Sequence, residues 1–186
     1  MGSTTRVEKA PMILSSIQDV SFFMHKKKLD DRGYFQRISD QNEIEKICSA
    51  NFIQSSVSFN SSKGTIRGLH FQAAPSKEWK YVTCLRGAIF DCVVDLRKNS
   101  ETYGQHIEFE LTEDNGLSVL IPPGVAHGFQ TLENETLISY QMTDVFNESL
   151  ARTLNWKDFS LDIKWPLDVT QISKSDTEGL PWPVIY

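Results

Sequence analysis

The chain has 186 residues, 40% of them hydrophobic and 23% charged, and its formal net charge is −5. This length allows one well-buried domain, and we expect residues 1–186 to form a single domain. The acidic balance argues against a broad nucleic-acid surface, which needs clustered Lys and Arg. No run approaches the ~18 apolar residues of a membrane-spanning helix. We therefore expect no nucleic-acid partner and no membrane partner.

The chain carries three cysteines, Cys48, Cys84 and Cys92, and none belongs to a CxxC pair. An odd number of cysteines without an export signal is typical of reduced thiols inside a cell. We therefore expect a cytoplasmic protein, with residues 1–12 as a flexible N-terminus before the folded domain.

One helical pattern stands in the first half of the chain. Asp40 followed by Glu43 can form a capping box, and Ile44 and Ile47 share a helical face. These features predict a helix between Asp40 and Cys48.

Most of the following chain has the pattern of β-strands. Residues 81–85 and 88–96 are β-rich runs around a tight turn, which predicts a hairpin. Residues 105–112 alternate between apolar and polar side chains, as a half-buried strand does. Residues 117–121 and 136–143 predict two further strands.

The end of the chain differs from this strand-rich part. Residues 147–186 are irregular, and we expect Trp156, Trp165 and Trp182 to anchor them on the barrel. Short, regularly spaced strands with little helix predict an all-β, antiparallel β-sandwich or barrel with a few short helices. The interior of such a barrel is a plausible active site, since inward side chains converge there from several strands.

Two spaced patterns resemble the signatures of the cupin barrel, a jelly roll. Residues 116–127 read Gly, five residues, Pro-x-Gly-x-x-His, and residues 64–70 read Gly, five residues, His. The cupin pattern continues with a second histidine and a glutamate, but Gln72 takes the histidine position and Ser76 or Lys77 the glutamate position. The remaining His70 and His127 are too few for a confident divalent site. We expect no metal, with a two-histidine site completed by Gln72 as the open alternative.

Several further stretches occur in one order. Together they resemble the dTDP-4-dehydrorhamnose 3,5-epimerase family from about Asp30 to Asp176. The stretches are RGLHFQ (67–72), KYV (80–82), GxIFDxVVDLR (87–97), IPxGxAHGF (121–129) and WPL (165–167).

This resemblance implies a cofactor-free, homodimeric cupin that acts on a nucleotide-diphosphate 4-keto sugar, a 6-deoxyhexose or a heptose. The implied role is surface polysaccharide or deoxysugar biosynthesis. The C4 ketone acidifies the C–H bonds at C3 and C5, so a base can form an enolate. Reprotonation on the opposite face then inverts the carbon.

The resemblance also implies four catalytic residues. His70 matches the family's base, and Asp176 matches the aspartate that pairs with it and stabilises the imidazolium. Tyr140 matches the acid on the opposite face, and Lys80 matches a lysine that steadies the enolate. The alternatives are that Asp176 is a solvated acid in a turn and that Tyr140 is an ordinary barrel tyrosine.

Four other residues match substrate-binding positions of the family. Arg32, Arg67 and His127 match positions that hold the diphosphate or sugar, and Gln54 matches a substrate-facing amide. In the family the segment with Arg32 reaches the neighbouring subunit's site, which implies a dimer.

Three positions depart from the family pattern. Arg37 stands where a glutamate is usual, Ser56 replaces an asparagine, and Phe146 replaces a second tyrosine. These departures leave open the nucleotide, the sugar length, and inversion at C3, C5 or both. Alternative functions are a related cupin 3,4-ketoisomerase, a non-catalytic sugar-nucleotide-binding cupin and a metal-dependent cupin oxygenase.

Overall fold

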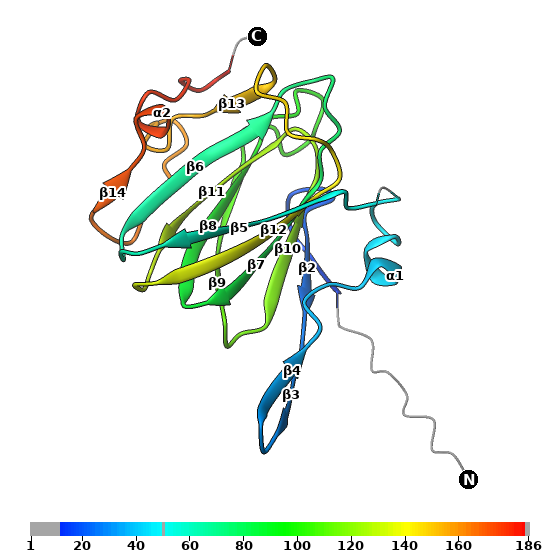
Figure 1. The fold of residues 1–186 in the computed structure, drawn as a ribbon. Coiled ribbons are helices and arrows are strands. Elements are labelled where there is room, and N and C mark those ends of the chain that lie inside the picture. Colours follow the sequence, from blue (N-terminus) through cyan, green and yellow to red (C-terminus); the bar gives the residue numbers. More distant parts are fainter. Residues whose placement is uncertain (1–11, 50, 185–186) are drawn as a thin grey trace.

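The computed structural model describes residues 12–49 and 51–184. Two sheets pack face to face, and a small hairpin projects from one end (Figure 1). The described strands pair antiparallel, with β14 as a parallel exception. The prediction of an all-β, cupin-type jelly roll with a few short helices is confirmed.

The order of the strands within each sheet follows from their pairing. The first sheet runs β1 (Met12–Leu14), β2 (Ser21–Met24), β10 (Leu117–Ile121), β7 (Lys80–Arg86), β12 (Thr136–Met142) and β5 (Gln54–Asn60). The second runs β13 (Ala151–Thr153), β6 (Thr65–Gln72), β11 (Val125–Thr131), β8 (Ala88–Asp95) and β9 (His106–Thr112), and β14 (Gln171–Ile172) also pairs with β6. The hairpin consists of β3 (Lys27–Asp30) and β4 (Gly33–Gln36), and the helices are α1 (Gln41–Ile44) and α2 (Lys174–Thr177).

Two apolar clusters hold the layers together. The larger fills the space between the sheets, where alternate residues of the strands point inward; it includes Val82, Val93, Val119, Phe129 and Ile138. The second lies on the outer face of β6, β8 and β11, under the C-terminal segment, and includes Leu69, Val94, Ala126, Leu154 and Leu161.

The predicted hairpin of residues 81–96 is wrong. Its two strands exist as β7 and β8, but β7 pairs with β10 and β12, whereas β8 pairs with β9 and β11. Gly87 forms the corner between the sheets with φ of +77°, and the register of β7 shifts just before it, between Arg86 and Cys84. Such bends and bulges let one chain pass from sheet to sheet. A local turn pattern cannot distinguish that corner from a hairpin.

The predicted helix is shorter than expected. Asp40 is its N-cap and accepts a hydrogen bond from the backbone N–H of Asn42, but α1 spans only Gln41–Ile44, and residues 45–47 form a turn. Ile44 is buried against Phe23 and Tyr81, so packing rather than helix length fixes this segment. Among the described residues, no helix is long and apolar enough to cross a membrane.

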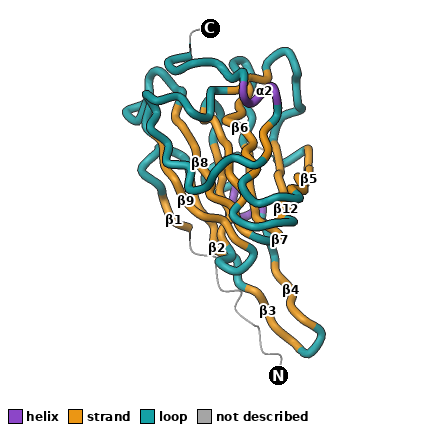
Figure 2. Tube along the Cα trace, turned by 90° about the vertical axis from the view of Figure 1, so that its left-hand side faces the viewer, coloured by secondary structure: helices purple, strands orange, loops and turns teal. Residues whose placement is uncertain are grey.

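The first and last described strands belong to different sheets. Of the N-terminal residues expected to be flexible, 1–11 lie outside the described residues, and Met12 begins β1. The C-terminal segment is mostly irregular but contributes β13, β14 and α2, all next to β6. Figure 2 shows α2 at the end of the barrel opposite the β3–β4 hairpin.

The cysteines Cys48, Cys84 and Cys92 are free and buried.

A buried carboxylate supports the loop after β8. Asp95 accepts hydrogen bonds from Arg97, Ser100 and Thr102. Burial alone would raise the pKa of Asp95, but these hydrogen bonds outweigh it and lower the pKa to about 2. A lowered folded-state pKa stabilises the fold above the unfolded value of 3.8 and loses that contribution as the pH falls toward about 2.

Asp95→Asn is therefore expected to lower the free energy of unfolding near neutral pH. We expect a loss of ~1–2 kcal/mol, since solvent screens part of the ion pair with the partly exposed Arg97. Urea denaturation at a series of pH values measures this, and the difference from the unmodified protein should shrink as the medium becomes acidic. Asp162→Asn, at an exposed carboxylate, is the control. An equal effect of both variants would contradict the assignment.

Candidate active site

A bulge in β6 places Arg67 and His70 on the same inward face. Residues three apart on a regular strand point to opposite faces. Here Arg67 pairs with Phe129 and His70 pairs with His127, so three residues of β6 span two residues of β11. Gly68 forms the bulge with φ of +118°, and a Cβ atom there would lie 2.6 Å from the Cα of Gly128. Only glycine fits this position.

His70 and Asp176 form a hydrogen-bonded pair. The His70 Nε2 atom lies 2.5 Å from the Asp176 carboxylate, which is buried, whereas the His70 side chain is 47% exposed. Ser173 caps α2 and accepts from the backbone N–H of Asp176, which fixes the aspartate under β6. Burial alone would raise the pKa of Asp176, but the contacts with His70, Ser173 and Gly68 outweigh it and hold the pKa below its usual value. Asp176 therefore stays ionised beside the imidazole.

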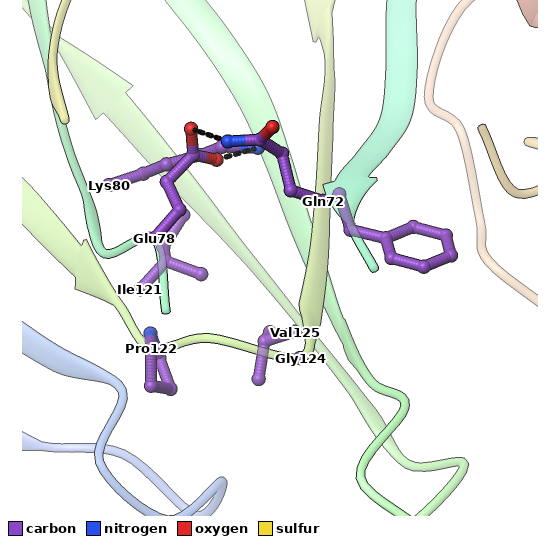
Figure 3. Close-up of a pocket in the computed structure, with 8 residues that line it drawn as sticks. Gln72, Glu78, Lys80, Ile121, Pro122, Gly124 and Val125 are labelled. Carbon is purple, nitrogen blue, oxygen red and sulfur yellow. Dashed lines mark hydrogen bonds and ion pairs between the residues drawn. The ribbon is translucent and has the colours of Figure 1, made fainter. Parts of the chain in front are cut away.

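Lys80 lies at the start of β7, beside His70. Its ammonium donates to the backbone carbonyl of His70 at 3.3 Å and pairs with Glu78 at 3.2 Å. Figure 3 shows that one oxygen of the Glu78 carboxylate contacts the Lys80 ammonium and the other contacts the side-chain amide of Gln72. The structure thus brings Lys80 to the strand that carries His70.

Tyr140 faces the same interior from the opposite sheet. Its ring centroid lies 6.3 Å from that of His127. Burial and the nearby Asp91 carboxylate raise the pKa of Tyr140 well above its usual value, while Arg67 and Ser58 act in the other direction. The phenol is therefore neutral at physiological pH.

His127 is buried and contacts the fully buried Asp91. Its Nε2 atom lies 2.9 Å from Oδ1 and 3.1 Å from Oδ2 of Asp91, and only the second contact has hydrogen-bond geometry. Burial raises the pKa of Asp91, and the contact with His127 partly offsets this. His127 therefore belongs to the inner wall of the site and packs beneath Tyr140.

Arg67 is exposed at the edge of the site, and its guanidinium is oriented by Asn60. The Nε–H group donates to the Asn60 side-chain oxygen at 2.7 Å. A groove of about 600 Å³ runs between Arg67 and residues 169–176, with Asp176 in its wall. An oriented guanidinium beside a groove of this size suits an anionic ligand.

Arg32 and Gln54 do not join this cluster. Arg32 lies at the turn of the β3–β4 hairpin, 90% exposed, and pairs with Asp30. Figures 1 and 2 show the hairpin extending away from the barrel. The Gln54 side-chain oxygen accepts from the backbone N–H of Phe146, which ties the loop after β12 to the start of β5.

The three departures from the family pattern lie in different parts of the structure. Arg37 pairs with Asp40, the cap of α1. Ser56 pairs in register with Tyr140 on the neighbouring strand. Phe146 is 62% exposed beside Gln54. Two of the departures, Ser56 and Phe146, thus lie next to proposed site residues.

Three residues of the site, Asn60, Glu78 and Asp91, were not predicted from the sequence. For Asp91 a signal existed, since it lies two residues from both Ile89 and Val93 and therefore shares their core-facing side of the strand. Glu78 lies one residue beyond Lys77, the last position at which the cupin pattern expects a glutamate. In the described part of the chain, no group of three or more His, Cys, Asp or Glu side chains could hold a metal ion.

Comparison with known proteins identifies the family. The family profile described as dTDP-4-dehydrorhamnose 3,5-epimerase matches residues 15–182. The chain belongs to the dTDP-4-dehydrorhamnose 3,5-epimerase family. The predictions of this family and of an isomerase are therefore confirmed.

Individual members of the dTDP-4-dehydrorhamnose 3,5-epimerase family agree with this assignment. The Sinorhizobium fredii enzyme is 37% identical over 167 residues, which cover 89% of this chain and 86% of the relative. The structure of a Bacillus anthracis dTDP-4-dehydrorhamnose 3,5-epimerase with TDP and PPi bound is 33% identical in sequence and superposes with a TM-score of 0.87. The match covers 92% of this chain and 99% of the Bacillus anthracis chain. A Legionella pneumophila structure in complex with dTDP-4-keto-L-rhamnose is 32% identical with a TM-score of 0.85, covering 91% of this chain and 90% of that one.

Proposed function

We propose that the protein inverts C3 and C5 of a dTDP-linked 4-keto-6-deoxyhexose without a metal or other cofactor. The observation that carries this proposal is the His70–Asp176 pair at the barrel mouth, beside Lys80 and across from Tyr140. The names of the relatives support the nucleotide and the sugar. A cytoplasmic location stays a prediction.

In this proposal His70 is the base. The ionised Asp176 accepts a hydrogen bond from Nε2–H, so the lone pair of the neutral imidazole lies on Nδ1. Proton transfer from C5 or C3 to Nδ1 breaks the C–H bond, and the bonding electrons form the enolate. Asp176 then stabilises the imidazolium.

Lys80 and Tyr140 complete the proposed reaction. The Lys80 ammonium stabilises the developing negative charge on the C4 oxygen. Tyr140, which is held neutral, donates its proton to the opposite face of the carbon, and the configuration is inverted. Inversion needs both groups, because return of the proton from His70 restores the original configuration.

We also propose that the substrate lies between two copies of the chain. Arg67, oriented by Asn60, and His127 belong to one subunit's pocket. Arg32 belongs to the projecting hairpin, which exposes Leu29, Tyr34 and Phe35. An arginine and three apolar side chains on a projecting hairpin fit the surface of a second copy, where Arg32 meets a phosphate.

Arg32→Ala is expected to raise KM about 10- to 100-fold through loss of a charge-assisted hydrogen bond. The direct measurement is complementation between Arg32→Ala and His70→Asn subunits. If Arg32 serves the partner's site, each mixed dimer contains one complete site, and mixing restores activity. Activity that stays at the level of the separate variants after verified subunit exchange would place Arg32 outside the neighbouring site.

The reaction itself is tested by incubating the protein with dTDP-4-keto-6-deoxy-D-glucose and assigning the product by NMR. We expect dTDP-4-keto-L-rhamnose. A 3-keto product would instead identify a 3,4-ketoisomerase, and dTDP binding without any product would identify a sugar-nucleotide-binding protein. Inversion at C3 or C5 alone would narrow the assignment to a monofunctional epimerase.

A further inference from the structure

Glu78 holds a buried carboxylate beside the proposed catalytic lysine. Its side chain is 7% exposed, and each of its oxygens meets a different donor. One oxygen lies 3.2 Å from the Lys80 ammonium, and the other accepts from Gln72 Nε2 at 2.8 Å (Figure 3). A buried charge is tolerated where it is paired and hydrogen-bonded in this way.

These contacts fix the direction of the Lys80 side chain. Its ammonium has three N–H donors; one donates to the backbone carbonyl of His70, and the Glu78 carboxylate holds the ammonium through an ion pair at 3.2 Å. The side chain is only 17% exposed, so little solvent competes for it. The hydrogen bond to His70 and the ion pair with Glu78 hold the ammonium in place and leave N–H donors for a further acceptor, such as the enolate oxygen.

The neighbouring amide shows why position 78 needs a carboxylate. Gln72 accepts the backbone N–H of Asn147 at 2.9 Å through its oxygen, so its Nε2 group must face Glu78. Both groups that face Glu78, the Gln72 amide and the Lys80 ammonium, are therefore donors. A glutamine at position 78 would present an NH₂ group to one of them, and that contact would become repulsive.

We propose that Glu78 is the positioning residue that aims the Lys80 ammonium at the ketone oxygen of the substrate. This inference rests on the proposed function in one respect, the role of Lys80 at the enolate. Glu78 itself acts through Lys80 and does not touch the substrate. Removal of its charge should therefore matter only while Lys80 is present.

The contact is tested first without any substrate. A largely shielded ammonium held by a hydrogen bond and an ion pair exchanges its protons slowly with water, so Lys80 should give a separate NH₃⁺ cross-peak in a ¹H–¹⁵N spectrum. Loss of this peak in Lys80→Met assigns it. We expect Glu78→Gln to abolish or broaden the peak, while Glu135→Gln, at an exposed ion pair with Arg86, leaves it unchanged. A Lys80 peak that is the same in Glu78→Gln would overturn the proposal.

Kinetics then separate positioning from general structural support. Glu78→Gln is expected to lower kcat about 10- to 100-fold, with KM nearly unchanged, because a misaimed group loses transition-state contact. In the Lys80→Met background the same substitution should have no further effect on kcat. Independent, additive losses in kcat would mean that Glu78 acts elsewhere.

A second variant keeps the proposal testable if Glu78→Gln does not fold. Glu78→Asp retains the charge with a shorter reach, so it should give a weakened Lys80 signal and an intermediate kcat. An unchanged signal and kcat in Glu78→Asp would count against positioning. The NMR contrast needs no sugar nucleotide, so a failure of the proposed reaction can be told apart from a failure of this inference.

Discussion

Replacing His70 with asparagine is expected to abolish both deuterium exchange and epimerisation, with losses of about 10³-fold or more, since the base is removed. Asparagine can still donate a hydrogen bond to the buried Asp176, so the fold should persist. Binding of dTDP, measured by calorimetry, should change by less than about 3-fold, because the lost interaction belongs to the transition state.

The control for this variant is His106→Asn. His106 lies on β9 and contacts Glu108, and two strands, β11 and β8, separate β9 from the strand of His70, so its substitution should leave exchange and inversion unchanged. If the His70 variant still exchanged solvent deuterium at either carbon at a rate near that of the unmodified protein, another residue would be the base.

Tyr140→Phe is expected to separate exchange from inversion. His70 can still remove the proton and return a deuteron to the same face, so exchange should fall only a few-fold, whereas inversion should fall about 10²-fold or more. Mass spectrometry of the recovered substrate measures exchange, and NMR of the sugar measures configuration. The expected signature is deuterated sugar of unchanged configuration.

Tyr103→Phe provides the matched control, because Tyr103 packs on Trp182 outside the site. It should leave both rates unchanged. Normal inversion by the Tyr140 variant would show that the proton on the opposite face comes from another group.

The sequence predicted the strands better than their arrangement. Residues 117–121 coincide with β10, and the alternating residues 105–112 contain β9. The corner at Gly87 was not predictable, because a strand's partners are chosen by packing across the whole core and not by its own turn. The helix after Asp40 was overestimated for a related reason, since its end is fixed by packing of Ile44.

The site was predictable in its residue types and less so in its geometry. The resemblance placed His70 and Asp176 together although 106 residues separate them, and the structure does bring them into contact. Periodicity would have placed Arg67 and His70 on opposite faces, and only the bulge at Gly68 reverses this. Glu78 escaped notice because its importance comes from Gln72 and Lys80, which converge only in the folded chain.

The most direct test of the proposed chemistry is the unmodified protein incubated with dTDP-4-keto-6-deoxy-D-glucose in heavy water. NMR of the sugar reports deuterium and configuration at each carbon. Enolate chemistry with a base and an acid on opposite faces predicts deuterium at both C3 and C5, with inversion at both. A folded protein that binds dTDP but introduces no deuterium at either carbon would contradict it.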